Sequence, residues 1–368
     1  PLLRVGWYEL GPAQGARVLV AAHHLVIDGV GWRILVGDLE TAYTQARSGA
    51  AIALPPKTTD VQRWAEQLVA YAQRDTLRAE AAYWLATLQP PPRPLPVDDL
   101  AGEPYNTEAT ARTVTMVLPA HETTALLQQV PQIYHMPIND ALLAALAQAY
   151  AQWSGASTLL LDLEGHGRED LFPGVDLSRT VGWFTTVYPV LLDIRQAVDL
   201  SAVLKSVKEQ LRAIPNHGIG YGLLRYLSQD TDVAARLREL PQPQISFNYL
   251  GQFDAVLAQS ALFRPASESI GPARSPSGRR SHLLEINAHI ANEQLHVVWT
   301  YSERVHRRAT VERFAHMFLA AMEAIVAHCQ SPDAGGYTPS DFPEADLSQT
   351  ELDELLTELG DSLEDWDE

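Results

Sequence analysis

The sequence predicts a mixed α/β or α+β protein with two lobes. Short strand-like apolar runs alternate with longer segments of helical periodicity along all 368 residues, and no repeat of fixed period is present. Residues 89–96 are rich in proline and predict an extended connector, because proline ends helices. We therefore expect a first lobe at 1–105, a second lobe at 106–340 and an acidic tail at 341–368.

The first lobe is expected to begin with two strands, at 3–10 and 17–22, joined by a turn that contains glycine and proline. Asp28 and Gly29 then start a helix whose apolar residues recur at helical spacing, and Asp28 is the candidate for its N-cap. A second, alanine-rich helical region spans about 58–88.

The second lobe is expected to mix strands and helices in the same way. Tyr188-Pro189 should break the third of its strands, Asn139 or Asp140 should lie near the cap of the second helix, and residues 264–280 read as a loop. The predicted strands lie at 113–118, 158–163, 181–193, 244–249, 283–290 and 295–301. The predicted helices lie at about 120–130, 138–153, 199–213 and 308–329, with one more after residue 222.

The charge of the chain is concentrated at one end. The formal net charge is −18, but twelve acidic and no basic residues lie in 341–368, so the rest of the chain carries −6. This balance argues against nucleic acid or an anionic membrane surface as a partner, since both attract basic patches. No apolar stretch is long enough to span a bilayer, and no signal peptide is visible. The single cysteine, Cys329, excludes an internal disulfide and predicts a cytoplasmic location.

Two adjacent histidines, His23 and His24, follow the strand predicted at 17–22, and Asp28 comes four residues after His24. Histidine titrates near neutral pH and can take and return a proton there. Because successive strand side chains alternate, we expect His24 to be reactive and His23 to be structural. Asp28 is expected to act as a cap or an ion-pair anchor. The alternative is a pair of core histidines whose ring nitrogens are satisfied.

Residues 164–169 read Glu-Gly-His-Gly-Arg-Glu and also follow a predicted strand. The two glycines remove side chains around His166 and let the backbone pass close to another group. Glu164 is therefore a second candidate for proton transfer. The alternative is an ordinary surface pair with Arg168, in which the carboxylate stays ionised.

A third candidate strand, in residues 246–252, carries Asn248 and Tyr249. Asn248 could donate to a developing enolate or hold a carbonyl, and Tyr249 could donate or stack. Ordinary polar residues of a strand are an equal alternative.

Other chemistries fit the sequence poorly. A His-Glu-x-x-His motif and a Gly-x-Ser-x-Gly motif are both absent, and one cysteine cannot form a thiolate zinc site. His282, His289 and His296 recur every seven residues, and this odd spacing predicts alternating strand faces and no shared metal. Residues 218–222, Gly-Ile-Gly-Tyr-Gly, lack the spacing of a phosphate loop and are interpreted as a tight turn.

Together with residues 179–189, 215–222 and 247–254, these stretches resemble the epimerization domain of a nonribosomal peptide synthetase. Residues 23–29 are similar to the His-His-x-x-x-Asp-Gly signature that condensation and epimerization domains share. The other four motifs resemble those particular to epimerization domains and occur in the expected order. The first part of the family's N-terminal lobe is not in this sequence, so we expect the chain to begin inside that lobe.

The resemblance implies the V-shaped, two-lobe fold of the chloramphenicol-acetyltransferase-like superfamily, with a site in a tunnel between the lobes. It implies an aminoacyl or peptidyl thioester on the 4′-phosphopantetheine of an upstream peptidyl carrier domain, and neither a directly bound cofactor nor a metal. His24 and Glu164 would remove and return the Cα proton, turning L into D, with the assignment of base and acid left open. The implied supporting residues are His23, Asp28, Arg168, Asn248 and Tyr249. The implied tunnel or substrate residues are Gly29, Trp183, Phe184, Tyr188, Tyr221 and Ser246.

Two other functions on the same fold remain open. One is a condensation domain that forms peptide bonds, and the other is a non-catalytic recognition module. The leucines of residues 347–359 predict an amphipathic acidic helix with nothing obvious of its own to pack on. We expect this helix to dock on a downstream synthetase, and a flexible linker is the alternative.

Overall fold

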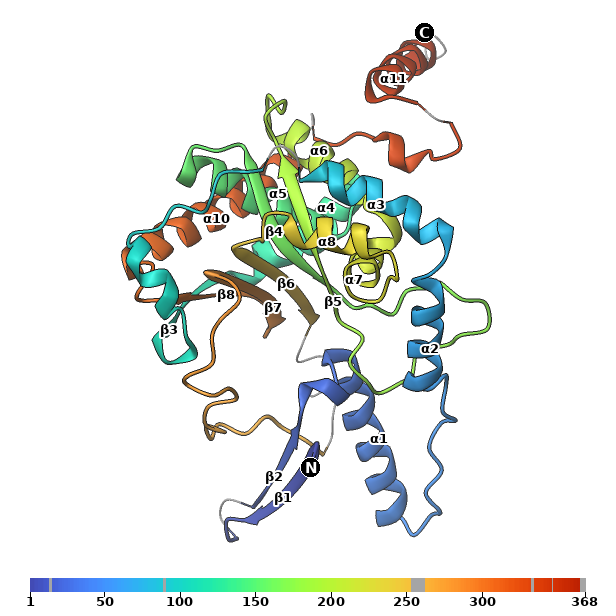
Figure 1. Cartoon of the computed structure of the whole chain (residues 1–368), viewed down its shortest axis with the longest axis vertical. Coiled ribbons are helices and arrows are strands. Elements are labelled where there is room, and N and C mark those ends of the chain that lie inside the picture. The colour runs from blue at the N-terminus through green and yellow to red at the C-terminus, as the bar shows by residue number, and fades with distance from the viewer. Residues whose placement is uncertain (13–14, 89–90, 253–261, 332–333, 346, 365–368) are drawn as a thin grey trace.

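The computed structural model describes residues 1–12, 15–88, 91–252, 262–331, 334–345 and 347–364. Within these ranges the second lobe holds one sheet, whose strands follow the order β3-β8-β7-β6-β4-β5 (Figure 1). Strand β6 runs parallel to β4 and β7, and the other neighbouring pairs are antiparallel. The strands are β3 (Ala111–Leu118), β4 (Thr158–Gly165), β5 (Thr186–Asp193), β6 (Ile245–Gln252), β7 (Leu284–Ala291) and β8 (Gln294–Ser302).

Helices pack on one face of this sheet, and a second group of helices lies beside its β5 edge (Figure 1). The first group is α4 (Ala120–Tyr134), α5 (Ile138–Ser154), α6 (Leu200–Arg212) and α10 (Arg308–Cys329). The second group is α3 (Asp75–Thr87), α7 (Ile219–Tyr226) and α8 (Thr231–Glu239). Strand alternation turns Leu161 and Leu163 of β4 into the buried core and places Asp162 and Glu164 on the opposite face.

The first lobe lies beside that opposite face, below the sheet in the view of Figure 1. It contains the antiparallel pair β1 (Leu3–Glu9) and β2 (Ala16–Ala22), followed by a short 3₁₀ turn, His24–Val26. Helix α1 (Gly29–Arg47) comes next, and α2 (Val61–Tyr71) leads to α3, which precedes residue 106 but packs with α7 and α8 of the second lobe. The 3₁₀ turn after β2 therefore carries His24 next to Trp183 of the second lobe.

Most predicted elements are confirmed, and the exceptions have local causes. The helical region at 58–88 is two helices, because the chain turns at residues 72–74. Pro189 does not break its strand: β5 is an edge strand, where a missing N–H leaves no ladder bond unmade. Helix α5 begins after Pro137, so Asn139 and Asp140 lie in its first turn, near the cap as expected, and Asp140 pairs with Arg212. The tight turn predicted at residues 218–222 lies slightly earlier, at Pro215–Gly218, and residues 219–222 belong to α7.

A buried lysine fastens the segment after α10 to the body. Lys208 of α6 is 1% exposed and donates to the Tyr134 carbonyl and to both carboxylate oxygens of Asp341, at 2.9, 2.7 and 2.6 Å. Burial opposes ionisation of Asp341, but the hydrogen bonds from Lys208 and Thr338 hold its pKa below the usual value. The lowered pKa favours the charged form of Asp341, and its bonds to Lys208 fix the turn Pro339–Asp341.

We predict that Asp341→Ala lowers the free energy of unfolding by about 3 kcal/mol, because it leaves the Lys208 charge buried without its partner. The double variant Lys208→Met, Asp341→Leu should recover most of this loss, since neither charge is then buried. Chemical denaturation of the native protein measures both values. A loss in Asp341→Ala that is within error of zero would contradict the structural role of the pair.

Candidate functional site

His24 lies at the junction of the two lobes. It begins the turn after β2, and its ring centroid is 5.2 Å from that of Trp183, a residue of the second lobe. His23 precedes it and accepts a hydrogen bond on Nδ1 from the Leu25 amide at 3.1 Å. The His23 ring is thus engaged by the backbone, while His24 is exposed beside Trp183.

Asp28 is the residue that holds the two lobes together at this point. Its Oδ1 accepts from the Gly31 amide at 2.7 Å and caps α1, while its Oδ2 accepts from the Phe184 amide at 3.1 Å. Arg168 donates to the same carboxylate at 3.1 and 3.3 Å. Asp28 is only 3% exposed, so both predicted parts, cap and ion-pair anchor, are confirmed at one buried carboxylate.

Arg168 lies in a position that differs from the expected one. It pairs with Asp28, donates to the carbonyls of Leu177 and Thr180 at 2.8 Å each, and stacks 4.1 Å above the Phe184 ring. Its position is therefore that of a brace between lobes and not that of a partner for Glu164. The cause is Gly167, whose left-handed backbone turns the chain after His166.

Glu164 is held by the third candidate strand. Asn248 of β6 donates to Oε2 of Glu164 at 2.6 Å, and the two residues are neighbours across the parallel pair of β4 and β6. Burial raises the pKa of the Glu164 carboxyl above its usual value, and the charge of His24 opposes this rise more strongly than that of His282 does. Glu285 adds to the rise, and Arg274 counteracts it. The His24 imidazole of the first lobe therefore lies near enough to the Glu164 carboxyl of the second lobe to favour its charged form.

Asp162 and His282 belong to the same polar face, and sequence reasoning did not select them as site residues. His282 Nε2 lies 2.8 Å from Oδ2 of Asp162, which is two residues before Glu164 on β4. The second ring nitrogen of His282 is 3.1 Å from the Ser281 hydroxyl. The sequence could have indicated Asp162, because strand side chains alternate and residues 162 and 164 of one strand therefore share a face. Its contact with His282 could not be predicted from a local pattern, because the two residues are 120 positions apart in the sequence.

The remaining predicted residues divide between the site and the core. Ser246 lies on the polar face, opposite Asp162 in the ladder, and Gly29 is the exposed first residue of α1. Tyr249 is on the other face of β6 from Asn248 and packs against the main core, so strand alternation turns it away from Glu164. Tyr188 is 6% exposed in the same core, where Gly218 packs on its ring.

A cavity of about 500 Å³ borders the site and contains three of the predicted tunnel residues, Trp183, Phe184 and Tyr221. Its walls come from α2, from residues 183–187 and from α7, and Asp162 lines one end. Trp183 links the cavity to His24, and Val187 links it to Glu164, its partner in the β4–β5 ladder. The cavity therefore passes close to both proton-transfer candidates.

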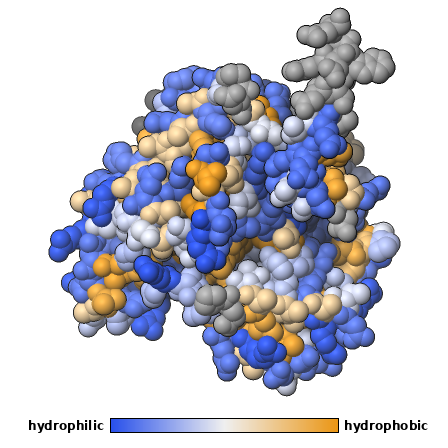
Figure 2. Space-filling view, turned by 90° about the horizontal axis from the view of Figure 1, so that it is seen from above, coloured by the Kyte–Doolittle hydropathy of each residue, from blue (hydrophilic) through white to orange (hydrophobic). Residues whose placement is uncertain are grey.

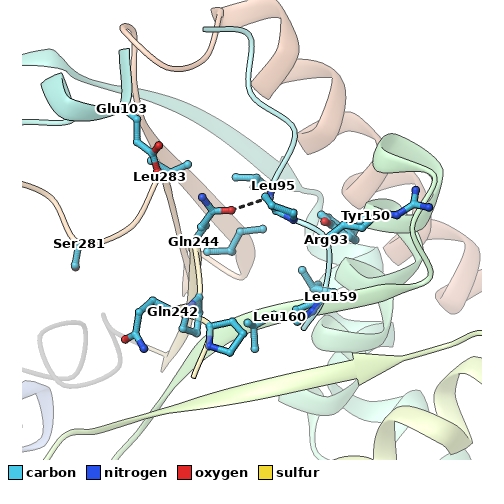
Figure 3. Close-up of a pocket in the computed structure, with 15 residues that line it drawn as sticks. Arg93, Leu95, Glu103, Tyr150, Leu159, Leu160, Gln242, Gln244, Ser281 and Leu283 are labelled. Atoms are coloured by element: carbon cyan, nitrogen blue, oxygen red, sulfur yellow. Dashed lines mark hydrogen bonds between the residues drawn. The ribbon is translucent and has the colours of Figure 1, made fainter. Parts of the chain in front are cut away.

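A second cavity, of about 330 Å³, lies at the far end of the same strands (Figure 3). It is bounded by the connector around Leu95 and by the first residues of β4 and β6, whereas Glu164 is near the end of β4. Gln244 points into it and accepts from the Leu95 amide at 2.7 Å, as the dashed line in Figure 3 shows. This cavity thus lies away from the proton-transfer candidates.

The histidines of the β7–β8 hairpin differ from expectation. His289 and His296 are direct partners in the ladder and lie on one face, because the tight turn between β7 and β8 brings them opposite each other. Their rings stack with 5.4 Å between the centroids.

Among the described residues, no three His, Cys, Asp or Glu side chains are placed to hold a metal ion. The helices that the structure describes also include none with the length and hydropathy of a membrane span. On the face seen in Figure 2, apolar residues form small groups among hydrophilic ones.

A profile of the family described as condensation domain matches residues 1–348 of this chain. The chain belongs to the condensation-domain family. It is 50% identical over 97% of its length to one component of the linear gramicidin synthase of Brevibacillus parabrevis, and 44% identical over 98% to chondramide synthase cmdD of Chondromyces crocatus. It spans only 5% and 9% of those two proteins. Its relatives are components of nonribosomal peptide synthetases, as the sequence motifs indicated.

Among solved structures, this condensation-family chain resembles the crystal structure of the epimerization domain from the third module of tyrocidine synthetase B. The TM-score is 0.82 at 38% identity, covering 89% of this chain and 73% of that one. The X-domain from teicoplanin biosynthesis, at 18% identity and a TM-score of 0.67, covers 90% of this chain and 73% of its own and shares the fold. The predicted fold class, that of the chloramphenicol-acetyltransferase-like proteins, is therefore confirmed.

We predict that Asn248→Leu raises the pKa of Glu164 further, because the carboxylate loses a hydrogen-bond donor that favours its charged form. The loss is measurable in a titration, since a hydrogen bond to a charged group is worth about 1.5–3 kcal/mol. Asn248→Asp should raise the pKa more, since it adds a like charge. Carbon NMR of labelled glutamate side chains would follow the titration, and an unchanged Glu164 signal in both variants would contradict the assignment.

Proposed function

We propose that this domain epimerizes the Cα centre of an aminoacyl or peptidyl thioester, from L to D, while a carrier domain holds the substrate. The observation that carries the proposal is that His24 and Glu164, from different lobes, each adjoin a residue that lines one cavity, Trp183 and Val187 respectively. The likeness to an epimerization domain, at 38% identity, supports it. The condensation reaction remains the rival, because the family profile that matches the chain is described as condensation domain.

The chemistry asks for two proton carriers on opposite sides of one carbon. The thioester carbonyl acidifies the Cα–H bond, and a base removes that proton to leave an enolate. An acid on the other face then donates a proton to Cα, so the base has gained one proton and the acid has lost one. Exchange with solvent restores both groups. We assign the two roles to His24 and Glu164 and leave their order open.

The surroundings of each group suit this work. Burial raises the pKa of Glu164, which brings it closer to that of an imidazole and lowers the cost of passing protons through the pair. Asn248 fixes the carboxylate by its bond to Oε2. The Trp183 ring lies beside the His24 ring, with 5.2 Å between the two centroids. Asp28 and Arg168 act at a distance, because they set the position of the turn that carries His24.

The substrate is proposed to arrive on the 4′-phosphopantetheine arm of an upstream peptidyl carrier domain. The arm is part of the substrate and supplies the thioester whose carbonyl stabilises the enolate. A cavity of about 500 Å³ beside Glu164 is within the size range of small-molecule sites, so the reacting end of such a substrate fits.

We predict that His24→Ala and Glu164→Ala each reduce Cα exchange by about 100-fold or more, because each removes one proton carrier. The measurement is deuterium uptake from solvent at Cα of the carrier-bound substrate, with no second aminoacyl carrier present. Carrier binding should persist in both variants, and His121→Ala, on an exposed part of α4, is the matched control. Full activity in both variants would overturn the assignment, and peptide-bond formation without exchange would favour condensation.

The acidic tail is proposed to dock on a downstream synthetase. The tail forms helix α11 (Gln349–Glu364), and Leu352 is 1% exposed, so the helix does have an anchor, contrary to expectation. Gln349 donates to the Tyr337 carbonyl at 3.3 Å. Leu355 is exposed on a surface that is otherwise acidic, which suits a basic groove with an apolar floor.

We predict that deleting residues 345–368 lowers peptide transfer to the next protein about tenfold or more, since an anchor residue of an interface is worth about 2 kcal/mol. Leu355→Arg should have a similar effect without disturbing the anchored part of the helix. Neither change should alter Cα exchange within the same protein. Transfer at the original rate in both variants would reject docking.

A further inference from the structure

The cavity beside Glu164 has a distinctive lining. One face of α2 supplies Val61, Trp64 and Leu68, at intervals of three and four residues as a helix face requires. Helix α7 lines the cavity along most of its length, from Ile219 to Tyr226. The cavity therefore lies between α2, α7 and the start of the edge strand β5.

Several apolar side chains at the rim of this cavity are exposed. Trp183 is 48% exposed, Val187 is 45% exposed and Tyr226 is 68% exposed, and all three line it. Grouped apolar exposure of this kind marks binding sites, because each side chain would gain free energy if it were covered. The occupant that would cover them is apolar.

The charged groups that line the cavity make hydrogen bonds to neighbouring side chains, although Nε of Arg225 has no hydrogen-bond partner among the described residues. Arg225 donates to the Tyr221 hydroxyl at 2.6 Å and to Gln242 at 3.1 Å. Asp162 lies 2.8 Å from His282 Nε2. A charged occupant would have to compete with these contacts, whereas an apolar one would leave them intact.

The position of the cavity tells which part of a substrate would fill it. Trp183 touches His24, and Val187 faces Glu164 in the ladder. A carbon atom between the two proton carriers therefore has the cavity at its side. In an enolate the Cα atom is planar, protons leave and return on its two faces, and the side chain stays in the plane. A fixed pocket in that plane holds the side chain throughout the reaction.

We propose that this cavity is the subsite for the side chain of the residue whose Cα is inverted, and that it selects large apolar or aromatic side chains. The inference rests on the proposed epimerization and adds the substrate class to it. A volume of about 500 Å³ leaves room for the largest natural side chains. Small and charged side chains would leave the exposed walls uncovered.

Gly222 offers a direct test. It lies on the lining face of α7, and a Cβ atom added there meets no heavy atom within 4 Å. Gly222→Phe would place a ring in the cavity without displacing backbone. Ala65→Phe would fill it from α2, at a position that is exposed and lies on the opposite wall. Gly37→Phe is the matched control, because Gly37 is also a helical glycine with open space, on α1 outside the cavity.

The experiment measures Cα deuterium exchange in the native protein with carrier-bound phenylalanyl, leucyl, alanyl and glutamyl thioesters. The unaltered protein should exchange the phenylalanyl substrate faster than the alanyl and glutamyl ones. Both filling variants should lower the ratio of the phenylalanyl to the alanyl exchange rate about tenfold or more. The reason is that the added ring takes the room that several carbon atoms of the substrate side chain would need. Gly37→Phe should keep the original ratio.

Two results would overturn the subsite. One is an unchanged ratio in both filling variants while the unaltered protein is active. The other is a preference of the unaltered protein for the glutamyl substrate. Absence of exchange with every substrate in the unaltered protein would instead count against epimerization itself, so failures of the subsite and of the proposed function are distinguishable.

Discussion

A single buried carboxylate fixes the geometry on which the site depends. Asp28 caps α1 through the Gly31 amide, accepts from the Phe184 amide and pairs with Arg168, all in a position that is 3% exposed. A buried charge is tolerated only when its hydrogen bonds are satisfied, so the lobes cannot separate here without leaving two ions unpaired. The turn that carries His24 is therefore held next to Trp183.

The open face of the sheet supplies the other half of the site. Strand alternation sends the leucines of β4 into the core and leaves Asp162 and Glu164 in a partly buried polar row. Burial raises the pKa of Glu164, and nearby histidines moderate the rise. A carboxyl that is neither fully hydrated nor locked in an ion pair is suited to passing a proton.

Several elements could be predicted because their signals are local. The β7–β8 hairpin, the capped helix after Asp28 and the long helix α10 all follow from periodicity and cap residues within one segment. Pro189, Tyr249 and the stacked His289–His296 pair could not be placed in this way. Each depends on which strand lies next to it, whether an edge, an opposite face or a ladder partner.

The sequence by itself determined the family, the two short motifs that carry His24 and Glu164, and the order of most helices and strands, because these reside in contiguous residues. The tertiary structure alone decided that Arg168 binds Asp28, that Asn248 holds Glu164, and that His282 meets Asp162. These contacts join residues 84 to 140 positions apart. Only sheet order and lobe packing bring such residues together, and neither is written in a local pattern.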